Sequence, residues 1–269
     1  MPGDGEPDDL YVRARAALLD TTEALAPHLG CIVLVGAQAI YLHTGAADLA
    51  VAEFTTDADF SVEPALLSDE PLIGELLEEH GFTTREHPGG WRSASGIYVD
   101  IMVPEALAGR GTRGADLGTH GRRAARRALG LEGALIDREQ RTIGALDPSD
   151  DRTVTMNVAG PGALIVAKAH KLWERTTHDD RIRDKDALDV YRLLQAIETA
   201  DLATRLARLR DSQEAGEVTS AAIEHLQVMF GSPAGTGVAL AVRATRSLVD
   251  PDELTAILVT LTNDLMAAL

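Results

Sequence analysis

The chain has little cysteine, no long apolar run and a shortage of positive charge, and each shortage excludes a class of protein. Cys31 is the only cysteine, so an intramolecular disulfide is impossible, and its place in the apolar run 31–35 predicts a buried structural thiol. No run approaches the roughly 18 apolar residues that a membrane span needs. Residues 1–9 show no signal-peptide pattern. We therefore expect a cytoplasmic protein without a membrane partner.

The formal net charge of -17 limits the partners, because the mean field of an acidic protein repels polyanions. Residues 105–127 are the exception, with arginines in clear excess over acids. This segment is either a solvated face beside a glycine-rich loop or a patch that binds the phosphates of a nucleic acid. We call its arginines the basic cluster: Arg110, Arg113, Arg122, Arg123, Arg126 and Arg127.

The order of predicted elements indicates an α+β fold with two domains. With 269 residues and 45% hydrophobic content the chain can bury two cores. Periodicity predicts strands at 32–35, 54–62, 82–87, 91–93, 96–103, 134–143 and 154–158, the last two at the edge of the sheet, and helices at 8–27, 37–43 and 66–80. After residue 160 it predicts helices alone, at 162–176, 185–198, 202–211, 214–230, 235–248 and 252–268.

We therefore predict a catalytic domain over residues 1–160, built on a mixed β-sheet with flanking helices. A helical domain over residues 161–269 follows it, and we expect that domain to close an active-site cleft.

Two aspartates lie two residues apart in a predicted strand. Because strand side chains alternate between faces, Asp57 and Asp59 share one face, and Ala58 and Phe60 share the other. Neighbouring carboxylates repel, so the pair costs free energy unless a cation lies between them. Mg²⁺ or Mn²⁺, bound by carboxylate oxygens, water and phosphates, would offset the repulsion. The alternative is an exposed strand edge with solvated acids.

Asp100 lies in the middle of the predicted strand 96–103, whose odd-numbered aliphatic residues share the opposite face. A carboxylate there is costly unless it binds a metal or accepts hydrogen bonds, although a sheet face open to water would also explain it. Three carboxylates on two strands suit a two-metal phosphoryl-transfer site. We assign the metals to Asp57 and Asp59, and a shared ligand and base role to Asp100.

Upstream, Gly36 joins the predicted strand 32–35 to a helix. Glycine lets the backbone approach a ligand, and the free N–H groups of a first helical turn bind anions. Gly36, Ala37 and Gln38 are therefore candidate nucleotide-binding residues, as is Thr56 beside the aspartate pair. Ordinary turn geometry is the alternative for the glycine.

Two later segments place charges at helical spacing. Lys168 and Lys171 share a helix face, and Asp186 and Asp189 share another that continues into an apolar stripe. The simple explanation is a solvated basic face and aspartates that favour a helix N-terminus.

The order strand-Gly-x-x-Ala, then Thr-x-Asp-x-Asp, then a strand aspartate resembles the polymerase-β-like nucleotidyltransferase superfamily. Segments 167–175 and 185–193 are similar to the branch that contains the AbiEii-type toxins of bacterial toxin-antitoxin systems. The resemblance covers about residues 32–194. Ala37 departs from it, because a serine is usual there, and the interval from Gly36 to Asp57 is longer than the superfamily norm.

The resemblance implies transfer of a nucleoside monophosphate from an NTP to an acceptor hydroxyl, with pyrophosphate leaving. Lys168 or Lys171 would contact the triphosphate, positioned by Asp186 or Asp189, and we count Lys168 and these two aspartates among the catalytic residues. The implied acceptor is RNA, at a tRNA 3′ end, held by the basic cluster. The implied role is that of a toxin countered by an antitoxin protein.

Two alternatives stay open beside it. One is transfer to a small molecule or a protein hydroxyl, which the acidic net charge favours. The other is a non-catalytic module that binds a nucleotide or a partner protein.

Overall fold

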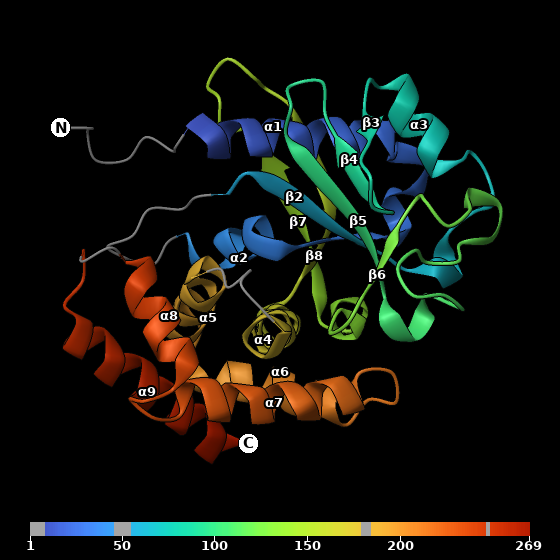
Figure 1. The fold of residues 1–269 in the computed structure, drawn as a ribbon. Coiled ribbons are helices and arrows are strands. Elements are labelled where there is room, and N and C mark those ends of the chain that lie inside the picture. The colour runs from blue at the N-terminus through green and yellow to red at the C-terminus, as the bar shows by residue number, and fades with distance from the viewer. Residues whose placement is uncertain (1–8, 46–54, 179–183, 246–247) are drawn as a thin grey trace. The chain divides into compact units, whose positions relative to one another are not determined.

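The computed structural model describes residues 9–45, 55–178, 184–245 and 248–269, and the chain divides into two compact units (Figure 1). Unit 1 comprises residues 1–39, 52–128 and 138–158. Unit 2 comprises residues 40–51, 129–137 and 159–269. Two short segments thus belong to unit 2 although they precede its main part in the sequence.

Unit 1 is built on a mixed sheet, which has eight strands among the residues that the structure describes. The strand order is β3-β4-β5-β2-β1-β8-β7, and β6 pairs with β5. The central strand β2 runs antiparallel to β1 and parallel to β5, and β1 runs parallel to β8. The strands are β1 Ile32–Val35, β2 Asp57–Val62, β3 Thr83–Thr84, β4 Gly90–Arg92, β5 Tyr98–Pro104, β6 Arg126–Ala128, β7 Arg138–Gly144 and β8 Thr153–Ala159.

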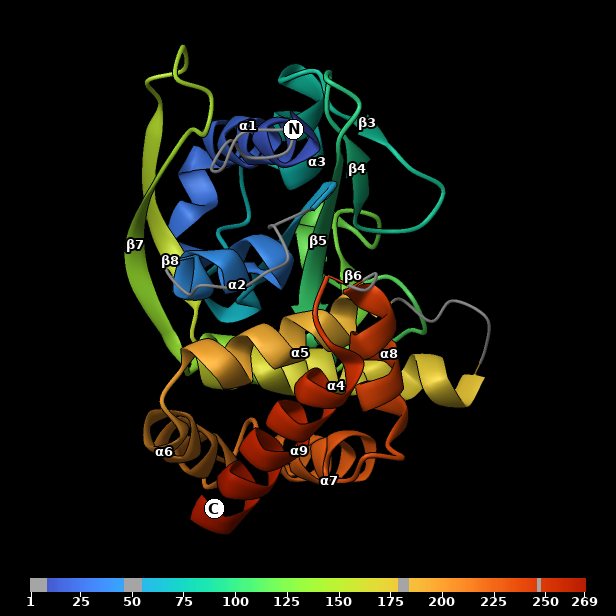
Figure 2. The same cartoon turned by 90° about the vertical axis from the view of Figure 1, so that its left-hand side faces the viewer.

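Helix α1 (Asp9–Ala24) covers one face of this sheet, and Figure 2 shows the strands β7–β8 and β4–β5 on opposite sides of it. Ala14 and Ala17 of the helix form a buried cluster with Ile97, so small side chains let the helix lie close to the sheet. Phe60 and Ile101, fully buried in β2 and β5, belong to the core of the unit. Because Ile97 faces α1 and strand side chains alternate between faces, the even-numbered residues of β5 lie on the face away from α1.

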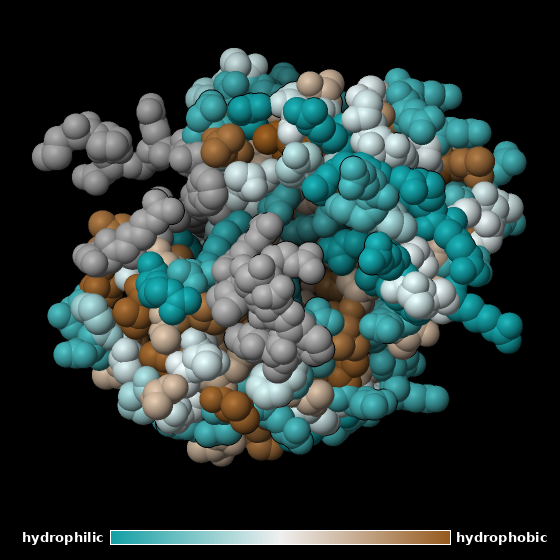
Figure 3. All heavy atoms as spheres, in the orientation of Figure 1, coloured by the Kyte–Doolittle hydropathy of each residue, from teal (hydrophilic) through white to brown (hydrophobic). Residues whose placement is uncertain are grey.

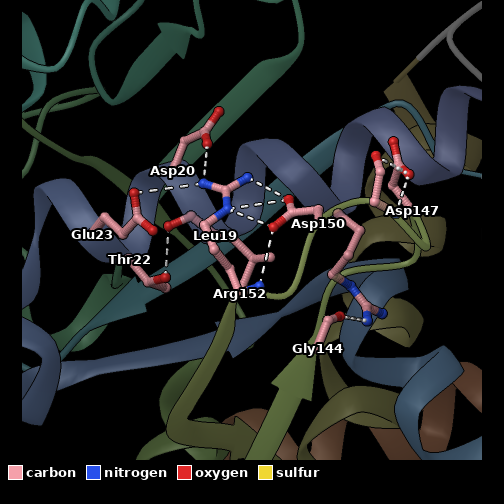
Figure 4. Close-up of polar contacts among 10 residues, drawn as sticks. Leu19, Asp20, Thr22, Glu23, Gly144, Asp147, Asp150 and Arg152 are labelled. Carbon is pink, nitrogen blue, oxygen red and sulfur yellow. Dashed lines mark hydrogen bonds and ion pairs between the residues drawn. The ribbon is translucent and has the colours of Figure 1, made fainter.

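A polar network ties the turn between β7 and β8 to α1 (Figure 4). Arg152 Nη1 lies 2.7 Å from Asp20 Oδ1 and 3.5 Å from Glu23 Oε2, both on α1. The same guanidinium donates to both carboxylate oxygens of Asp150, and these bonds lower the pKa of Asp150. Arg15 of α1 donates to the carbonyl of Gly144 at 3.0 Å. These contacts fix the position of α1 along the sheet.

Unit 2 is helical, and none of its described residues after 160 forms a strand, as the sequence predicted. Helix α4 packs against α5, α6 and α7. Its start is held by Asp137, whose buried carboxylate accepts from Ala163 N at 3.1 Å and from Arg205 Nη1 at 2.7 Å. The helices are α4 Pro161–His178, α5 Asp184–Ala196, α6 Thr199–Arg210, α7 Gly216–Phe230, α8 Thr236–Ala244 and α9 Pro251–Ala268.

The predicted mixture of a sheet, flanking helices and C-terminal helices is confirmed, whereas several element bounds are wrong. The helix predicted over 66–80 begins only at Ile73 (α3, Ile73–Glu79), because Pro71 has no N–H and disfavours helical backbone before it. The strand predicted over 134–143 begins at Arg138, after a short 3-10 helix at Glu132–Leu135. The strand predicted over 82–87 shrinks to β3.

β8 lies inside the sheet and not at its edge, since it pairs with both β1 and β7. Within the long interval from Gly36 to Asp57, residues 46–54 lie outside the described residues.

Cys31 is buried, as predicted. Burial raises the pKa of its thiol to about 11, so the reactive thiolate is disfavoured. Of the helices that the structure describes, none combines the length and the apolar character needed to cross a membrane.

The start of α9 provides a test of local structure. Asp250 Oδ1 accepts hydrogen bonds from the backbone N–H groups of Asp252 and Glu253, each at 3.0 Å, so it caps the helix. We predict that Asp250→Ala lowers the free energy of unfolding by about 1 kcal/mol, as the loss of a helix cap does elsewhere. Urea unfolding measures the loss, with Asp252→Ala as the control. Equal losses in both variants would contradict the assignment.

Candidate active site

Three carboxylates lie together on the face of the sheet opposite α1. In the parallel pair β2–β5, Asp59 lies directly beside Asp100, and Asp57 lies beside Tyr98. Residues opposite each other in neighbouring strands project to the same side, so all three aspartates share this face. We call Asp57, Asp59 and Asp100 the acidic face. Each is partly exposed, and Asp59 and Asp100 lie between strand residues that are fully buried.

Gly36 lies against the acidic face at the junction of β1 and helix α2 (Gly36–Thr44). Its φ is 72°, in the left-handed region that glycine adopts freely. A Cβ atom at this position would overlap the Asp59 carboxylate. Only a residue without a side chain therefore lets Asp59 take its place beside the start of the helix.

Gln38 supports the acidic face from inside the unit. Its buried side-chain amide donates to the carbonyls of Ala14 and Asp57, each at 3.0 Å, and accepts from Arg15 Nε at 3.0 Å. Both ends of the amide are thus used within unit 1, and they join α1 to the start of β2. The side chain holds the strand that carries Asp57.

The other candidate nucleotide-binding residues of unit 1 differ in exposure. Ala37 is buried in the first turn of α2, whereas Thr56 is exposed just before β2. Next to Thr56, Thr55 donates from its hydroxyl to Asp57 Oδ1 at 2.7 Å. This bond orients the Asp57 carboxylate.

Two arginines flank Asp100. Arg126 Nη2 donates to Asp100 Oδ2 at 3.2 Å, and Arg85 Nη1 lies 3.8 Å from Oδ1. Asp100 Oδ1 is buried and accepts no hydrogen bond from the residues that the structure describes. Arg85 also stacks on the exposed ring of Tyr98, with Cζ 3.9 Å from the ring centroid. The sequence predicted neither arginine as a partner of Asp100, because both contacts depend on how strands far apart in the chain pair.

The oxygen donors of the acidic face fit a hard divalent cation, because carboxylates are the protein ligands that Mg²⁺ and Mn²⁺ prefer. Within the described ranges, however, no group of three or more His, Cys, Asp or Glu side chains is arranged to hold a metal ion. The Asp100 carboxylate is turned toward arginines. The backbone thus brings the three predicted ligands to one face, while the side chains do not form a three-ligand centre.

Most of the basic cluster is bonded within unit 1. Arg122 pairs with Asp116 at 2.8 Å, and Arg123 donates to the carbonyl of Arg85 at 2.8 Å. Arg127 donates to the carbonyls of two loop residues, Gly109 and Gly111. Segment 105–128 has little regular structure, so these guanidinium groups supply donors that its carbonyls would otherwise lack.

Arg126 pairs with Asp100. Arg110 and Arg113 are therefore the members of the basic cluster whose exposed side chains make no hydrogen bond or ion pair among the described residues. Figure 3 shows hydrophilic side chains gathered over β4, β5 and β6.

The predicted lysines and aspartates of unit 2 form a buried ionic cluster between α4 and α5. Lys168 Nζ lies 2.7 Å from Asp186 Oδ1 and 2.6 Å from Asp189 Oδ2, and the lysine is only 5% exposed. Burial would lower the pKa of Lys168, but the attraction and hydrogen bonds of the two carboxylates outweigh it and raise the pKa. The ammonium group therefore stays charged at neutral pH.

Lys171 lies at the edge of this cluster. Its Nζ is 3.3 Å from Asp186 Oδ1, and its side chain is 42% exposed. Of the two lysines, Lys171 is the one that solvent reaches. Lys168 does not belong to a solvated basic face, which was the simple explanation of this pattern.

No protein-family model matches the chain, and no curated protein sequence matches it either.

The glycine at the acidic face can be tested by adding one methyl group. We predict that Gly36→Ala destabilises unit 1 by about 1–3 kcal/mol, because it strains the backbone and displaces the Asp59 carboxylate. Gly30→Ala is the matched control, since a Cβ there meets nothing within 4 Å. Chemical unfolding compares the two, and similar stabilities would show that Gly36 is not required by Asp59.

The ionic cluster of unit 2 predicts unequal effects for its lysines. Lys168→Met leaves two buried carboxylates without their main counterion, so we expect a loss of about 3–5 kcal/mol in the free energy of unfolding. Lys171→Met removes a largely exposed partner and should cost about 1 kcal/mol or less. Urea unfolding followed by circular dichroism measures both. A loss in Lys171→Met as large as that in Lys168→Met would contradict this account.

Proposed function

We propose that the chain is a metal-dependent nucleotidyltransferase, which transfers a nucleoside monophosphate from an NTP to an acceptor hydroxyl and releases pyrophosphate. The observation that carries the proposal is the acidic face: Asp59 beside Asp100 on neighbouring parallel strands, with Asp57 on the same side. Like charges so close in the middle of a sheet lower stability unless a cation compensates them. A role in catalysis explains why three carboxylates are kept on this face despite that cost.

Asp57 and Asp59 would hold Mg²⁺ or Mn²⁺, and Asp100 would join them once its arginines release it. A bound cation would stabilise the charge that develops on the transferred phosphoryl group. The Thr55 hydroxyl orients Asp57, and the backbone next to Gly36 keeps Asp59 in place. Asp100 is the proposed acceptor of the proton that the attacking hydroxyl loses.

In unit 1, the start of α2 is the proposed contact for the phosphates of the nucleotide. The N–H groups of the first turn of α2, at Gly36 and Ala37, are donors suited to an anion. Lys171 takes the triphosphate role that the resemblance gives to one of two lysines, since Lys168 is buried and bonded to Asp186 and Asp189. Lys168 would then act by positioning those carboxylates.

The resemblance to AbiEii-type toxins extends the proposal to the acceptor and the biological role. The acceptor would be RNA, at the 3′ end of a tRNA, and the protein would inhibit growth until an antitoxin counters it. Arg110 and Arg113 are exposed and make no side-chain hydrogen bond or ion pair among the described residues, so they are the members of the basic cluster most available to RNA phosphates.

A second candidate is transfer to a small molecule or to a protein hydroxyl. It is favoured by the bonding of Arg122, Arg123, Arg126 and Arg127 inside unit 1, which leaves few free cations for a polyanion. The net charge of -17 points the same way.

The acidic face is tested by removing one charge at a time. We predict that Asp57→Asn and Asp59→Asn keep the fold and reduce transfer by orders of magnitude, because each removes a proposed metal ligand. The assay incubates the protein with each labelled NTP, Mg²⁺ and total cellular RNA, and separates the products on a gel. Asp69→Asn, an exposed aspartate outside the acidic face, is the matched control.

Each outcome of this assay separates the candidates. Label in RNA that disappears in both variants supports the first function. Label in protein or in small molecules supports the second. Wild-type activity in a folded Asp57→Asn variant rules out the proposed metal role.

A further inference from the structure

Arg85 and Arg126 approach Asp100 from two different parts of unit 1. Arg126 is the first residue of β6, and Arg85 follows β3. The side chains of Arg126 and Arg85 are about one-third exposed, at 33% and 32%, and the side chain of Asp100 is 22% exposed. Each guanidinium carries five N–H donors, so one carboxylate leaves most of them free to bond to other groups.

Arg85 is held in this position from two sides. Its guanidinium stacks on Tyr98, and its backbone carbonyl accepts from Arg123 Nη2 at 2.8 Å. The residue of β4 that pairs with Asp100 is Gly90, and the imidazole of His87 lies where a side chain at position 90 would lie. The two arginines are therefore positioned before any ligand arrives.

We propose that Arg85 and Arg126 form a binding site for the diphosphate part of a nucleotide, and that the Asp100 carboxylate takes the place of the phosphate in this structure. The inference rests on the proposed function, because it places this anion site beside the acidic face. It assigns the binding of the phosphates in unit 1 to these two side chains. Asp100 thus pairs with the arginines in the absence of a ligand, and with the cation once the nucleotide is bound.

The charges explain why the exchange favours a phosphate. Asp100 carries one negative charge, and the two arginines beside it carry two positive charges. When a divalent cation binds the carboxylates, Asp100 no longer compensates the arginines, and the nearest suitable anion is the phosphate that the same cation binds. Two planar guanidinium groups can donate to several oxygens of a diphosphate, which suits them better than a single carboxylate does.

The test releases the arginines without any metal. Asp100→Asn keeps the size of the side chain and removes its charge, so both guanidinium groups lose their ionic partner. We predict that this variant binds inorganic pyrophosphate about fivefold more tightly than the wild type in EDTA, as measured by calorimetry. Adding Arg126→Gln or Arg85→Gln to Asp100→Asn should abolish the gain.

The chain offers two matched controls. Asp116→Asn makes the same change in charge but releases only the exposed Arg122, so its gain should stay below about twofold. Arg110→Gln added to Asp100→Asn removes one exposed arginine that is not part of the pair, and it should leave the gain intact. Asp100→Ser serves as the second variant if Asp100→Asn does not fold, with the melting temperature as the check.

The outcomes separate this inference from the proposed function, because the measurement needs no metal, no NTP and no transfer. A gain in Asp100→Asn that depends on Arg85 and Arg126 supports the site even if no transfer activity is found. The proposal is overturned if Asp100→Asn gains no more than Asp116→Asn, or if Arg110→Gln removes the gain as fully as Arg126→Gln does. In those cases the two arginines are only counterions of Asp100.

Discussion

Repulsion among three carboxylates on one face of β2 and β5 is the constraint around which unit 1 is arranged. Asp59 fits because Gly36 has no side chain, and Asp57 is oriented by Thr55. Asp100 is compensated by Arg85 and Arg126. Each of these contacts reduces a repulsion that aliphatic residues at the same positions would not cause. We therefore relate the three carboxylates to a chemical function and not to the stability of the unit.

Unit 2 also holds charged side chains close together. Lys168 lies between Asp186 and Asp189 inside the helical unit, and all three charged groups are buried there. Removing one of the three groups would leave a buried charge without its partner, and the ion pairs join α4 to α5. The same arrangement that makes Lys168 important for stability makes Lys171 the lysine open to a ligand.

The arginines show how tertiary structure changes the meaning of a charged segment. Along the chain the basic cluster is the densest positive region, yet most of its side chains bond to carbonyls or acids of unit 1. A segment with many glycines and little regular structure needs such donors to satisfy its own carbonyls. Much of the basic cluster is therefore used to build the loop, and fewer of its arginines are available to a partner.

Local patterns were sufficient to determine which residues alternate in β2 and β5 and that Gly36 ends a strand, because each depends on neighbours within a few residues. They also placed the two later charge clusters on helices. Only the tertiary structure decided that β2 and β5 are parallel neighbours with Asp59 beside Asp100, that Arg85 reaches Asp100, and that Lys168 is buried. The reason is physical: strand pairing, burial and ion pairing join residues far apart in the chain, and their free energies depend on the whole packed unit.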